Sequence, residues 1–207
     1  MSARGKLLLA SSNRGKLAEL TELSRQDPSG AKFQFAAVPD FDSIPQFDES
    51  APTFAENAAG KALHYSRYCG EPVIADDSGL VVPALGGAPG VRSARYAGEG
   101  ATDAQRIEKL LSEMRGKTGA DREAHFVCVL AIADAGRCLA VVSDRTDGIV
   151  AESPRGKGGF GYDPVFYFTE LGKTFAELSR EEKNRYSHRG KAFRRLLKAA
   201  HEFFGAA

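Results

Sequence analysis

The chain has 207 residues, of which 43% are hydrophobic and 27% charged, so it can bury a substantial core and is too apolar for a disordered chain. Its net charge of +1 indicates neither a nucleic-acid partner nor a membrane surface as binding partner. Three cysteines without CxxC spacing disfavour a zinc site and a disulfide framework. Because we find neither a secretory signal pattern nor a membrane-spanning apolar run, we expect a soluble cytoplasmic protein of one domain.

The first predicted elements are a strand and a helix joined by a polar turn. Leu7-Leu8-Leu9-Ala10 is a short apolar run that predicts a buried strand, and it ends at Ser11-Ser12-Asn13. Leu17, Leu20 and Leu23 then recur at helical spacing. The chain therefore begins with a strand, a turn and a helix.

This strand-to-helix junction has the features of a phosphate site. Ser11-Ser12-Asn13-Arg14-Gly15-Lys16 lies where a strand gives way to a helix, a place where the backbone N–H groups of the helix start and the helix dipole attract phosphate, and Lys16 adds a full positive charge. The run matches neither the GxxxxGK[ST] nor the GxGxxG pattern. The alternative is a capped surface helix with solvated Arg14 and Lys16.

An acidic pair precedes the second predicted helix. Thr53 and Glu56 form a capping-box pattern that predicts a helix through about Tyr68. Asp48-Glu49, just before it, could supply a carboxylate to a bound cation. The alternative is a solvated acidic loop.

A second acidic pair follows an apolar run. Pro72-Val73-Ile74-Ala75 predicts a buried strand, Asp76-Asp77 follows it, and we interpret Ser78-Gly79 as the turn that ends the strand. Adjacent carboxylates are costly unless a cation balances them. Because neighbouring side chains of a strand point to opposite faces, we expect one of the two carboxylates to face a site and the other to brace it. An ordinary strand-end turn is the alternative.

The remaining elements predict a mixed α/β sheet. Thr102 with Gln105 repeats the capping-box pattern and begins a helix. Residues 125–150 form two β-rich runs separated by Asp134-Ala135-Gly136, a hairpin loop, and a last helix follows Ser187. Helices combined with strands and one antiparallel hairpin predict a mixed α/β sheet with flanking helices.

Two further segments could recognise a ligand. In Gly158-Gly159-Phe160-Gly161-Tyr162-Asp163-Pro164, glycines would let the backbone approach a ligand and an aromatic ring could stack on a nucleobase. His188 and Arg189 could donate hydrogen bonds to a keto oxygen, and Lys183 could reach a base or a phosphate. The alternatives are a tight turn pinned by core aromatics and a solvated helix start.

The order of these motifs resembles the inosine triphosphate pyrophosphatase family, also called Ham1-like or non-canonical purine NTP pyrophosphatases. The resemblance spans nearly the whole chain. It rests on Ser11-Ser12-Asn13-Arg14-Gly15-Lys16, Thr53-Phe54-Ala55-Glu56-Asn57-Ala58, Ala75-Asp76-Asp77-Ser78-Gly79-Leu80, Leu85-Gly86-Gly87-Ala88-Pro89-Gly90-Val91-Arg92-Ser93-Ala94-Arg95-Tyr96, Gly159-Phe160-Gly161-Tyr162-Asp163-Pro164 and Ser187-His188-Arg189-Gly190.

The resemblance implies a fold and an activity. Members have an elongated mixed β-sheet with flanking helices in two lobes around a central nucleotide-binding cleft, which here would be one two-lobed domain over residues 1–207. They are commonly homodimers. They hydrolyse ITP, dITP and XTP to the monophosphate and pyrophosphate with Mg²⁺, which keeps deaminated purines out of nucleic acids. The expected partner is therefore a small nucleotide, with no nucleic acid and no membrane.

By resemblance, Asp77 would bind magnesium and act as the base on water, and Ser78 would contact the substrate. A carboxylate from Asp48 or Glu49 would complete the metal site; this chain has Asp48-Glu49-Ser50 where Glu-Glu-Thr is usual, so either acid can be the ligand. Ser-Ser precedes Asn13 where Thr-Gly is frequent, and serine can still donate. The residues expected to hold the triphosphate are Ser11, Ser12, Asn13, Arg14, Gly15 and Lys16.

The resemblance also implies a purine site. Phe160, Gly161, Tyr162 and Asp163 would form the base-stacking segment. Lys183, His188 and Arg189 would read the purine. Two other functions remain open: a Maf-like pyrophosphatase that acts on pyrimidine nucleotides, and a regulator that binds nucleotides without hydrolysing them.

Overall fold

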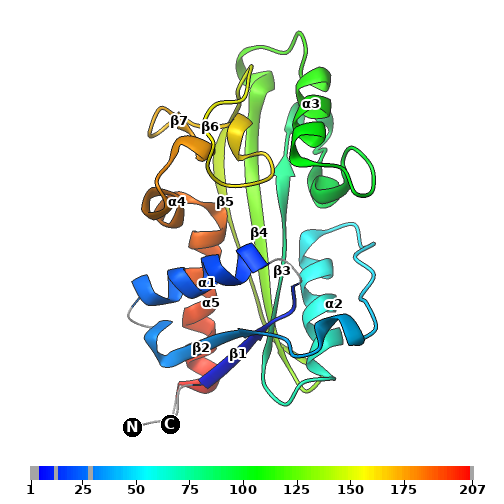
Figure 1. The fold of residues 1–207 in the computed structure, drawn as a ribbon, viewed down its shortest axis with the longest axis vertical. Helices are drawn as coiled ribbons and strands as arrows, with labels where there is room; N and C mark the ends of the chain where they lie inside the picture. Colours follow the sequence, from blue (N-terminus) through cyan, green and yellow to red (C-terminus); the bar gives the residue numbers. More distant parts are fainter. Residues whose placement is uncertain (1–4, 12–13, 28–29, 206–207) are drawn as a thin grey trace. The chain divides into compact units, whose positions relative to one another are not determined.

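The computed structural model describes residues 5–11, 14–27 and 30–205. Its seven-stranded sheet has the order β2-β1-β3-β4-β5-β6-β7, with β1 parallel to β2 and β3, and β6 antiparallel to β5 and β7, which confirms the predicted mixed α/β class (Figure 1). The strands are β1 (Gly5–Leu9), β2 (Phe33–Ala37), β3 (Val73–Val81), β4 (Glu123–Asp134), β5 (Arg137–Val150), β6 (Phe166–Phe168) and β7 (Lys173–Thr174). The helices are α1 (Arg14–Gln26), α2 (Phe54–Ser66), α3 (Asp103–Glu113), α4 (Arg180–Tyr186) and α5 (His188–Phe204).

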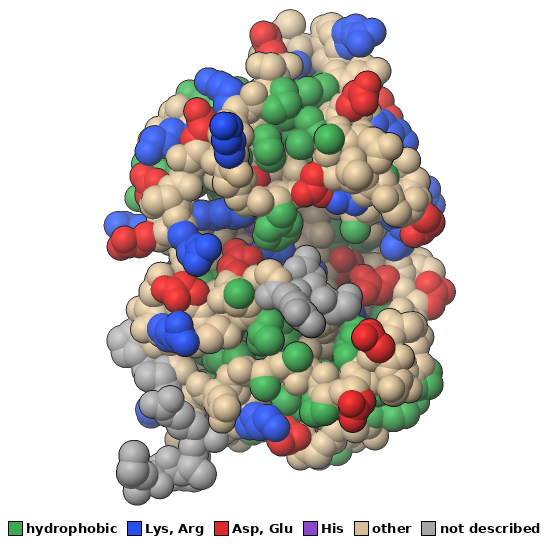
Figure 2. Space-filling model, in the orientation of Figure 1, with side chains coloured by type: hydrophobic (Ala, Val, Ile, Leu, Met, Phe, Trp, Pro, Cys, Tyr) green, Lys and Arg blue, Asp and Glu red, His purple; other side chains and the backbone are tan. Residues whose placement is uncertain are grey.

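The chain divides into two compact units. Unit 1 comprises residues 1–77, 128–144 and 189–207, and unit 2 comprises residues 78–127 and 145–188. Figure 2 shows acidic and basic side chains interspersed over the drawn face, in keeping with a net charge of +1. None of the helices in the described part of the chain is long and apolar enough to cross a membrane.

The core of unit 1 lies between the sheet and helices α1 and α5. Leu20 of α1 and Phe193 of α5 join side chains of one sheet face, such as Leu7 and Ile74, in one buried cluster. Helix α2 lies on the other side of β3 from α1 and α5 (Figure 1). Burial of this much apolar surface on both faces is the main force that holds the strands in place.

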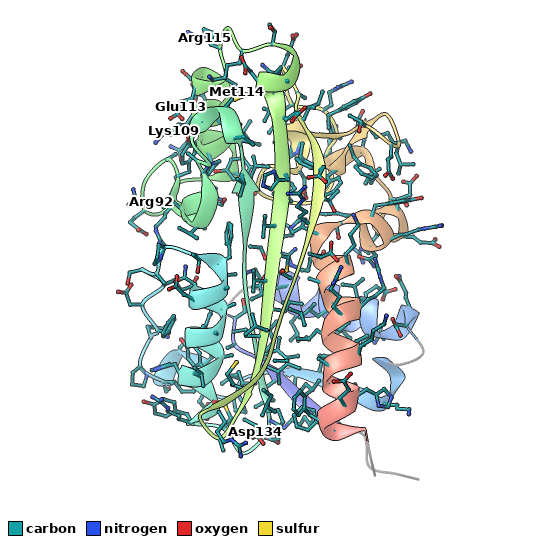
Figure 3. The ribbon with its side chains drawn as sticks, turned by 180° about the vertical axis from the view of Figure 1, so that it is seen from behind. Arg92, Lys109, Glu113, Met114, Arg115 and Asp134 are labelled. Atoms are coloured by element: carbon teal, nitrogen blue, oxygen red, sulfur yellow. The ribbon has the colours of Figure 1, made fainter. Side chains whose placement is uncertain are left out.

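Unit 2 has an aromatic core. Phe166 lies against both Phe126 and Phe175, with ring centroids 4.6 and 4.7 Å apart, and the apolar face of α3 is buried in the same cluster. The polar side of α3 carries Lys109 and Glu113, which are labelled in Figure 3. Helix α3 begins as predicted, because Thr102 accepts a hydrogen bond from the backbone of Gln105 and the complete capping box is present.

The predicted hairpin is also confirmed. Strands β4 and β5 are separated by Ala135 and Gly136 alone, and both residues have positive φ angles, as a tight hairpin turn requires. Figure 3 labels Asp134 at this end of β4. In a hairpin, the turn type and the loop length set the register of the two strands, so this two-residue turn sets the register of β4 and β5.

One element boundary was predicted wrongly. Ser78-Gly79 does not end the strand, because β3 continues to Val81 and the turn comes later, at residues 83–87. The backbone N–H of Leu80 donates to the Ser93 hydroxyl at 2.9 Å, a contact that keeps the strand extended beyond Gly79. Asp76 and Asp77 therefore lie in the middle of a nine-residue strand rather than at its end.

Arg122 links the end of α3 to the end of β5 within unit 2. Its Nε and Nη2 atoms donate to the carbonyls of Val150 and Ala151 at 2.7 and 2.9 Å, and Nη1 donates to that of Lys117 at 3.2 Å. We predict that Arg122→Met lowers the free energy of unfolding by about 2–3 kcal/mol, because buried carbonyls lose a charged donor. Urea denaturation measures this, with exposed Arg115→Met as a control that should change the value by less than about 0.5 kcal/mol.

Candidate active site

The acidic pair of β3 sends its two side chains to opposite faces of the sheet in unit 1. Asp76 meets Lys16 of α1 and Arg189 of α5, whereas Asp77 meets Asn57 of α2. This is the alternation that strand geometry requires. The two carboxylates, although adjacent in sequence, therefore have different chemical surroundings.

Asp76 is buried and its charge is balanced by cations. Lys16 Nζ forms an ion pair with Asp76 Oδ1, and Arg189 Nε lies 3.6 Å from Asp76 Oδ2. Arg189 Nη1 also donates to Glu19 Oε2 at 2.8 Å. Burial acts to lower the pKa of Arg189, but the charges of Glu19 and Asp76 outweigh it and raise that pKa, so the guanidinium stays charged. Asp76 is thus part of a neutralised, buried network.

Asp77 is also buried, but its hydrogen bond comes from a neutral amide rather than a cation. Its Oδ2 accepts a hydrogen bond from Asn57 Nδ2 at 3.0 Å. Burial, followed by the charges of Glu49 and Asp76, raises the pKa of Asp77 to about 6, although the Asn57 hydrogen bond and Lys16 act in the opposite direction. A carboxylate that is costly to ionise would gain from a nearby cation or could accept a proton near neutral pH.

Asn57 is fixed in the orientation that serves Asp77. The backbone N–H of Ala51 donates to Asn57 Oδ1 at 3.0 Å, which leaves the amide nitrogen to donate to Asp77. Thr53 begins α2 as predicted, by accepting a hydrogen bond from the backbone of Glu56, so the cap places Asn57 at the end of the first turn. Asn57 was not predicted as a site residue, although it lies in one of the six motifs.

The acidic loop before α2 contributes Glu49 to this cluster. Glu49 is half-buried, forms an ion pair with Lys61 and acts electrostatically on Asp77, whereas Asp48 is exposed. Among the described residues, no group of three or more His, Cys, Asp or Glu side chains could hold a metal ion by itself. Two carboxylates fit Mg²⁺ nonetheless, because this ion takes one or two protein carboxylates together with water and phosphate oxygens.

The strand-to-helix junction is described only in part. Ser12, Asn13 and the side chain of Arg14 lie outside the described residues. Gly15 is exposed at the start of α1, and Lys16 is 20% exposed while it pairs with Asp76. A lysine in this place can interact with a ligand and with the buried carboxylate at once. Ser11 and Ser78 are both half-buried.

The predicted aromatic segment lies in unit 2 and has one exposed ring. Phe160 is 42% exposed, whereas Tyr162 is 3% exposed and donates its hydroxyl to the carbonyl of Ser93 at 2.9 Å. Lys183 Nζ lies 4.8 Å from the centre of the Phe160 ring and forms an ion pair with Asp163. Asp163 in turn accepts the backbone N–H of Phe160 at 2.8 Å. The structure therefore brings together Phe160, Asp163 and Lys183.

A cavity of about 970 Å³ lies beside this segment in unit 2. Its lining includes Asp103, Ile107 and Leu111 of α3, together with Gly159, Phe160 and Gly161. Small-molecule sites have volumes of roughly 300–1,000 Å³, so a ligand of nucleoside size can be accommodated.

The last predicted residues, His188 and Arg189, fall in different units. His188 is buried in unit 2, where its ring stacks on Phe126 with the centroids 4.6 Å apart. Arg189 belongs to unit 1 and pairs with Glu19 and Asp76. Glu19 was not predicted as a site residue, since an acid one turn after Lys16 on a polar helix face has no distinguishing sequence signal.

Comparison with known proteins identifies the family. The Ham1 family model matches residues 7–199. The chain belongs to the Ham1 family. It is 51% identical over 199 residues to a Geobacillus kaustophilus protein named dITP/XTP pyrophosphatase, with 96% of each chain covered. A Thermus thermophilus protein of the same name is 48% identical over 194 residues, which cover 94% of this chain and 91% of that protein.

Two solved structures share the fold of this Ham1 chain. The HAM1 protein of Coxiella burnetii is 43% identical and superposes with a TM-score of 0.84, covering 96% of this chain and 99% of that one. A Mycobacterium abscessus structure entitled nucleoside-triphosphatase / dITP/XTP pyrophosphatase is 37% identical with a TM-score of 0.71, covering 93% and 98%. Membership of the Ham1 family, predicted from six motifs, is confirmed.

Proposed function

We propose that this protein hydrolyses the non-canonical purine nucleotides ITP, dITP and XTP to the monophosphate and pyrophosphate. The observation that carries the proposal is the difference between the two adjacent carboxylates of β3. Lys16 and Arg189 balance the charge of Asp76, whereas buried Asp77 has a raised pKa. The relatives named dITP/XTP pyrophosphatases, about half identical over nearly the whole chain, support the substrate class.

In the proposed reaction, water attacks the α-phosphorus of the substrate. A bond forms between the water oxygen and phosphorus, the bond from phosphorus to the α–β bridging oxygen breaks, and pyrophosphate leaves with the electron pair. Asp77 accepts the proton of the water; without a bound cation, burial raises the pKa of this carboxyl to about 6. Lys16 and the backbone N–H groups at the start of α1 stabilise the negative charge of the triphosphate.

Mg²⁺ is the cofactor that the acidic cluster fits, with Asp77 and Glu49 as the protein ligands. When bound, the ion would offset phosphate charge and lower the cost of keeping Asp77 ionised in its buried setting. Asn57 orients Asp77 whether or not a cation is present, because the amide hydrogen bond holds one carboxylate oxygen.

In unit 2, the ring of Phe160 stacks on the purine base, and Lys183 beside it donates a hydrogen bond to the base. Tyr162 instead anchors the segment in the core. A donor favours the keto group of hypoxanthine or xanthine and is mismatched with the amine of adenine. His188 and Arg189 stay predicted purine readers; Arg189 is buried and pairs with Glu19 and Asp76.

The proposal is tested with a panel of nucleoside triphosphates and Mg²⁺, monitored for pyrophosphate. We expect release from ITP, dITP and XTP, and slow or no release from ATP. Release of orthophosphate, or equal rates on ATP and ITP, would contradict the proposal. Preference for dTTP or UTP would favour the Maf-like alternative, and binding without turnover would favour a regulator.

The acidic loop gives a matched pair of variants. Because Glu49 acts on Asp77 and Asp48 is exposed, we predict that Glu49→Gln raises the Mg²⁺ concentration for half-maximal rate by roughly tenfold, whereas Asp48→Asn leaves it nearly unchanged. A magnesium titration of the steady-state rate measures both. The reverse ranking would assign the metal to Asp48. A homodimer and a cytoplasmic location stay predictions.

A further inference from the structure

The segment that carries Phe160 has a backbone that needs external support. Gly159 and Gly161 flank Phe160 with φ angles of +73° and +62°, and residues 159–162 lie outside any helix or strand. A side chain at Gly159 would fall against the carboxylate of Asp163, so glycine is required for that carboxylate to reach the backbone. Glycine-rich backbone loses much conformational entropy when it is ordered, and contacts must offset this loss.

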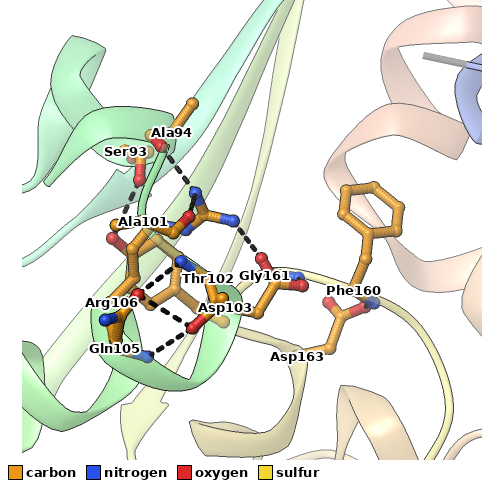
Figure 4. Close-up of polar contacts among 11 residues, drawn as sticks. Ser93, Ala94, Ala101, Thr102, Asp103, Gln105, Arg106, Phe160, Gly161 and Asp163 are labelled. Carbon is orange, nitrogen blue, oxygen red and sulfur yellow. Dashed lines mark hydrogen bonds and ion pairs between the residues drawn. The ribbon is translucent and has the colours of Figure 1, made fainter. Parts of the chain in front are cut away.

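Two carboxylates hold this backbone on either side of Phe160. Asp163 Oδ2 accepts the N–H of Phe160 at 2.8 Å, a contact within the segment itself. Asp103 Oδ2 accepts the N–H of Gly161 at 2.7 Å, although it lies 58 residues away in the sequence (Figure 4). Hydrogen bonds to a charged acceptor are the strong ones, so Asp103 ties the segment to α3.

Asp103 is itself held in place. Its Oδ1 atom forms an ion pair with Arg106, whose Nη1 donates to the carbonyls of Ala94 and Ala101 at 2.6 and 2.7 Å. Figure 4 shows this network leading from Ala94 through Arg106 and Asp103 to Gly161. One carboxylate oxygen therefore faces the segment while the other is fixed to Arg106.

Helix capping does not explain the position of Asp103. Thr102 caps α3 by accepting the backbone N–H of Gln105 at 3.3 Å, and the Gln105 side chain accepts the N–H of Thr102 at 2.8 Å. The capping box is complete without the Asp103 side chain. Its carboxylate is thus available for Gly161.

We propose that Asp103 is a positioning residue for purine binding, which fixes the exposed ring of Phe160 by holding the N–H of Gly161 against α3. The inference rests on the proposed function, since it assigns to Phe160 the stacking role. A ring held in its binding orientation loses less conformational entropy when the base stacks on it, so the contact supports substrate affinity rather than the chemical step.

The experiment compares Asp103→Ala with Thr102→Ala, which weakens the cap of α3 but leaves the contact to Gly161. We expect Asp103→Ala to raise KM for ITP about tenfold, the loss of one charge-assisted hydrogen bond, with kcat changed less than about threefold. Inhibition by inorganic tripolyphosphate, which has no base, should be unchanged. Asp103→Asn, which keeps one acceptor, should have an intermediate KM.

A second measurement does not depend on turnover. Hydrogen exchange of the peptide that contains Gly161 should become faster in Asp103→Ala and stay at the wild-type rate in Thr102→Ala. If wild-type protein releases no pyrophosphate from ITP, the proposed function fails and hydrogen exchange still tests the tether. An unchanged KM in an active Asp103→Ala protein, an equal rise in Thr102→Ala, or unchanged exchange would each overturn the role of Asp103.

Discussion

Asp77→Asn should abolish pyrophosphate release from ITP, with kcat lowered at least about a thousandfold, while much of the nucleotide affinity remains. Asparagine is nearly the same size and can still accept the Asn57 hydrogen bond, but it cannot take a proton from water. Turnover is measured by pyrophosphate release and affinity by calorimetric titration with ITP. A variant with substantial activity would remove Asp77 as the base.

A stability measurement shows whether Asp77→Asn loses turnover because the base is missing or because the protein no longer folds. Burial and the neighbouring acids raise the pKa of Asp77 to about 6, so at pH 7.5 ionising this carboxyl opposes folding of the metal-free protein. Asparagine avoids that cost, and the thermal midpoint without metal should stay the same or rise. Asp42→Asn, which removes an exposed charge from unit 1, is the matched control and should leave both turnover and stability unchanged.

The parts of the fold that were predictable depend on local chemistry. Thr53 and Thr102 begin helices because their hydroxyls bond to a backbone N–H three residues on, and this contact can be read from the sequence. The continuation of β3 past Ser78-Gly79 could not be, since it is supported by Ser93, thirteen residues from Leu80. The short helix α4 was also missed, in a segment without an apolar stripe of its own.

The same limit applies to the site. Adjacent acids on a strand must point to opposite faces, so different roles for Asp76 and Asp77 followed from strand geometry. Their partners did not, because Asn57 and Arg189 reach them only through the packing of α2 and α5 on the sheet. The contact between Asp103 and Gly161 has no sequence signal at all, since neither residue type is unusual at a helix start or in a glycine-rich loop.

Lys16→Met should lower kcat/KM for ITP by about 100- to 1,000-fold, because the triphosphate loses a cation that stabilises its developing charge. The variant also removes the ion pair between Lys16 and the buried carboxylate of Asp76, so stability should fall, by about 1–3 kcal/mol. Lys6→Met is the control: it breaks an ion pair with Glu71 in which both side chains are 38% exposed. It should cost less than about 1 kcal/mol and leave turnover unchanged.

A double variant decides whether Lys16 acts on the substrate or only on Asp76. Lys16→Met with Asp76→Asn removes the carboxylate together with the lysine that pairs with it, so stability should recover relative to Lys16→Met alone. Turnover should stay low, because the positive charge toward the triphosphate is still missing. If the double variant instead regains wild-type kcat/KM, Lys16 serves the fold through Asp76, and the phosphate charge must be stabilised by other groups.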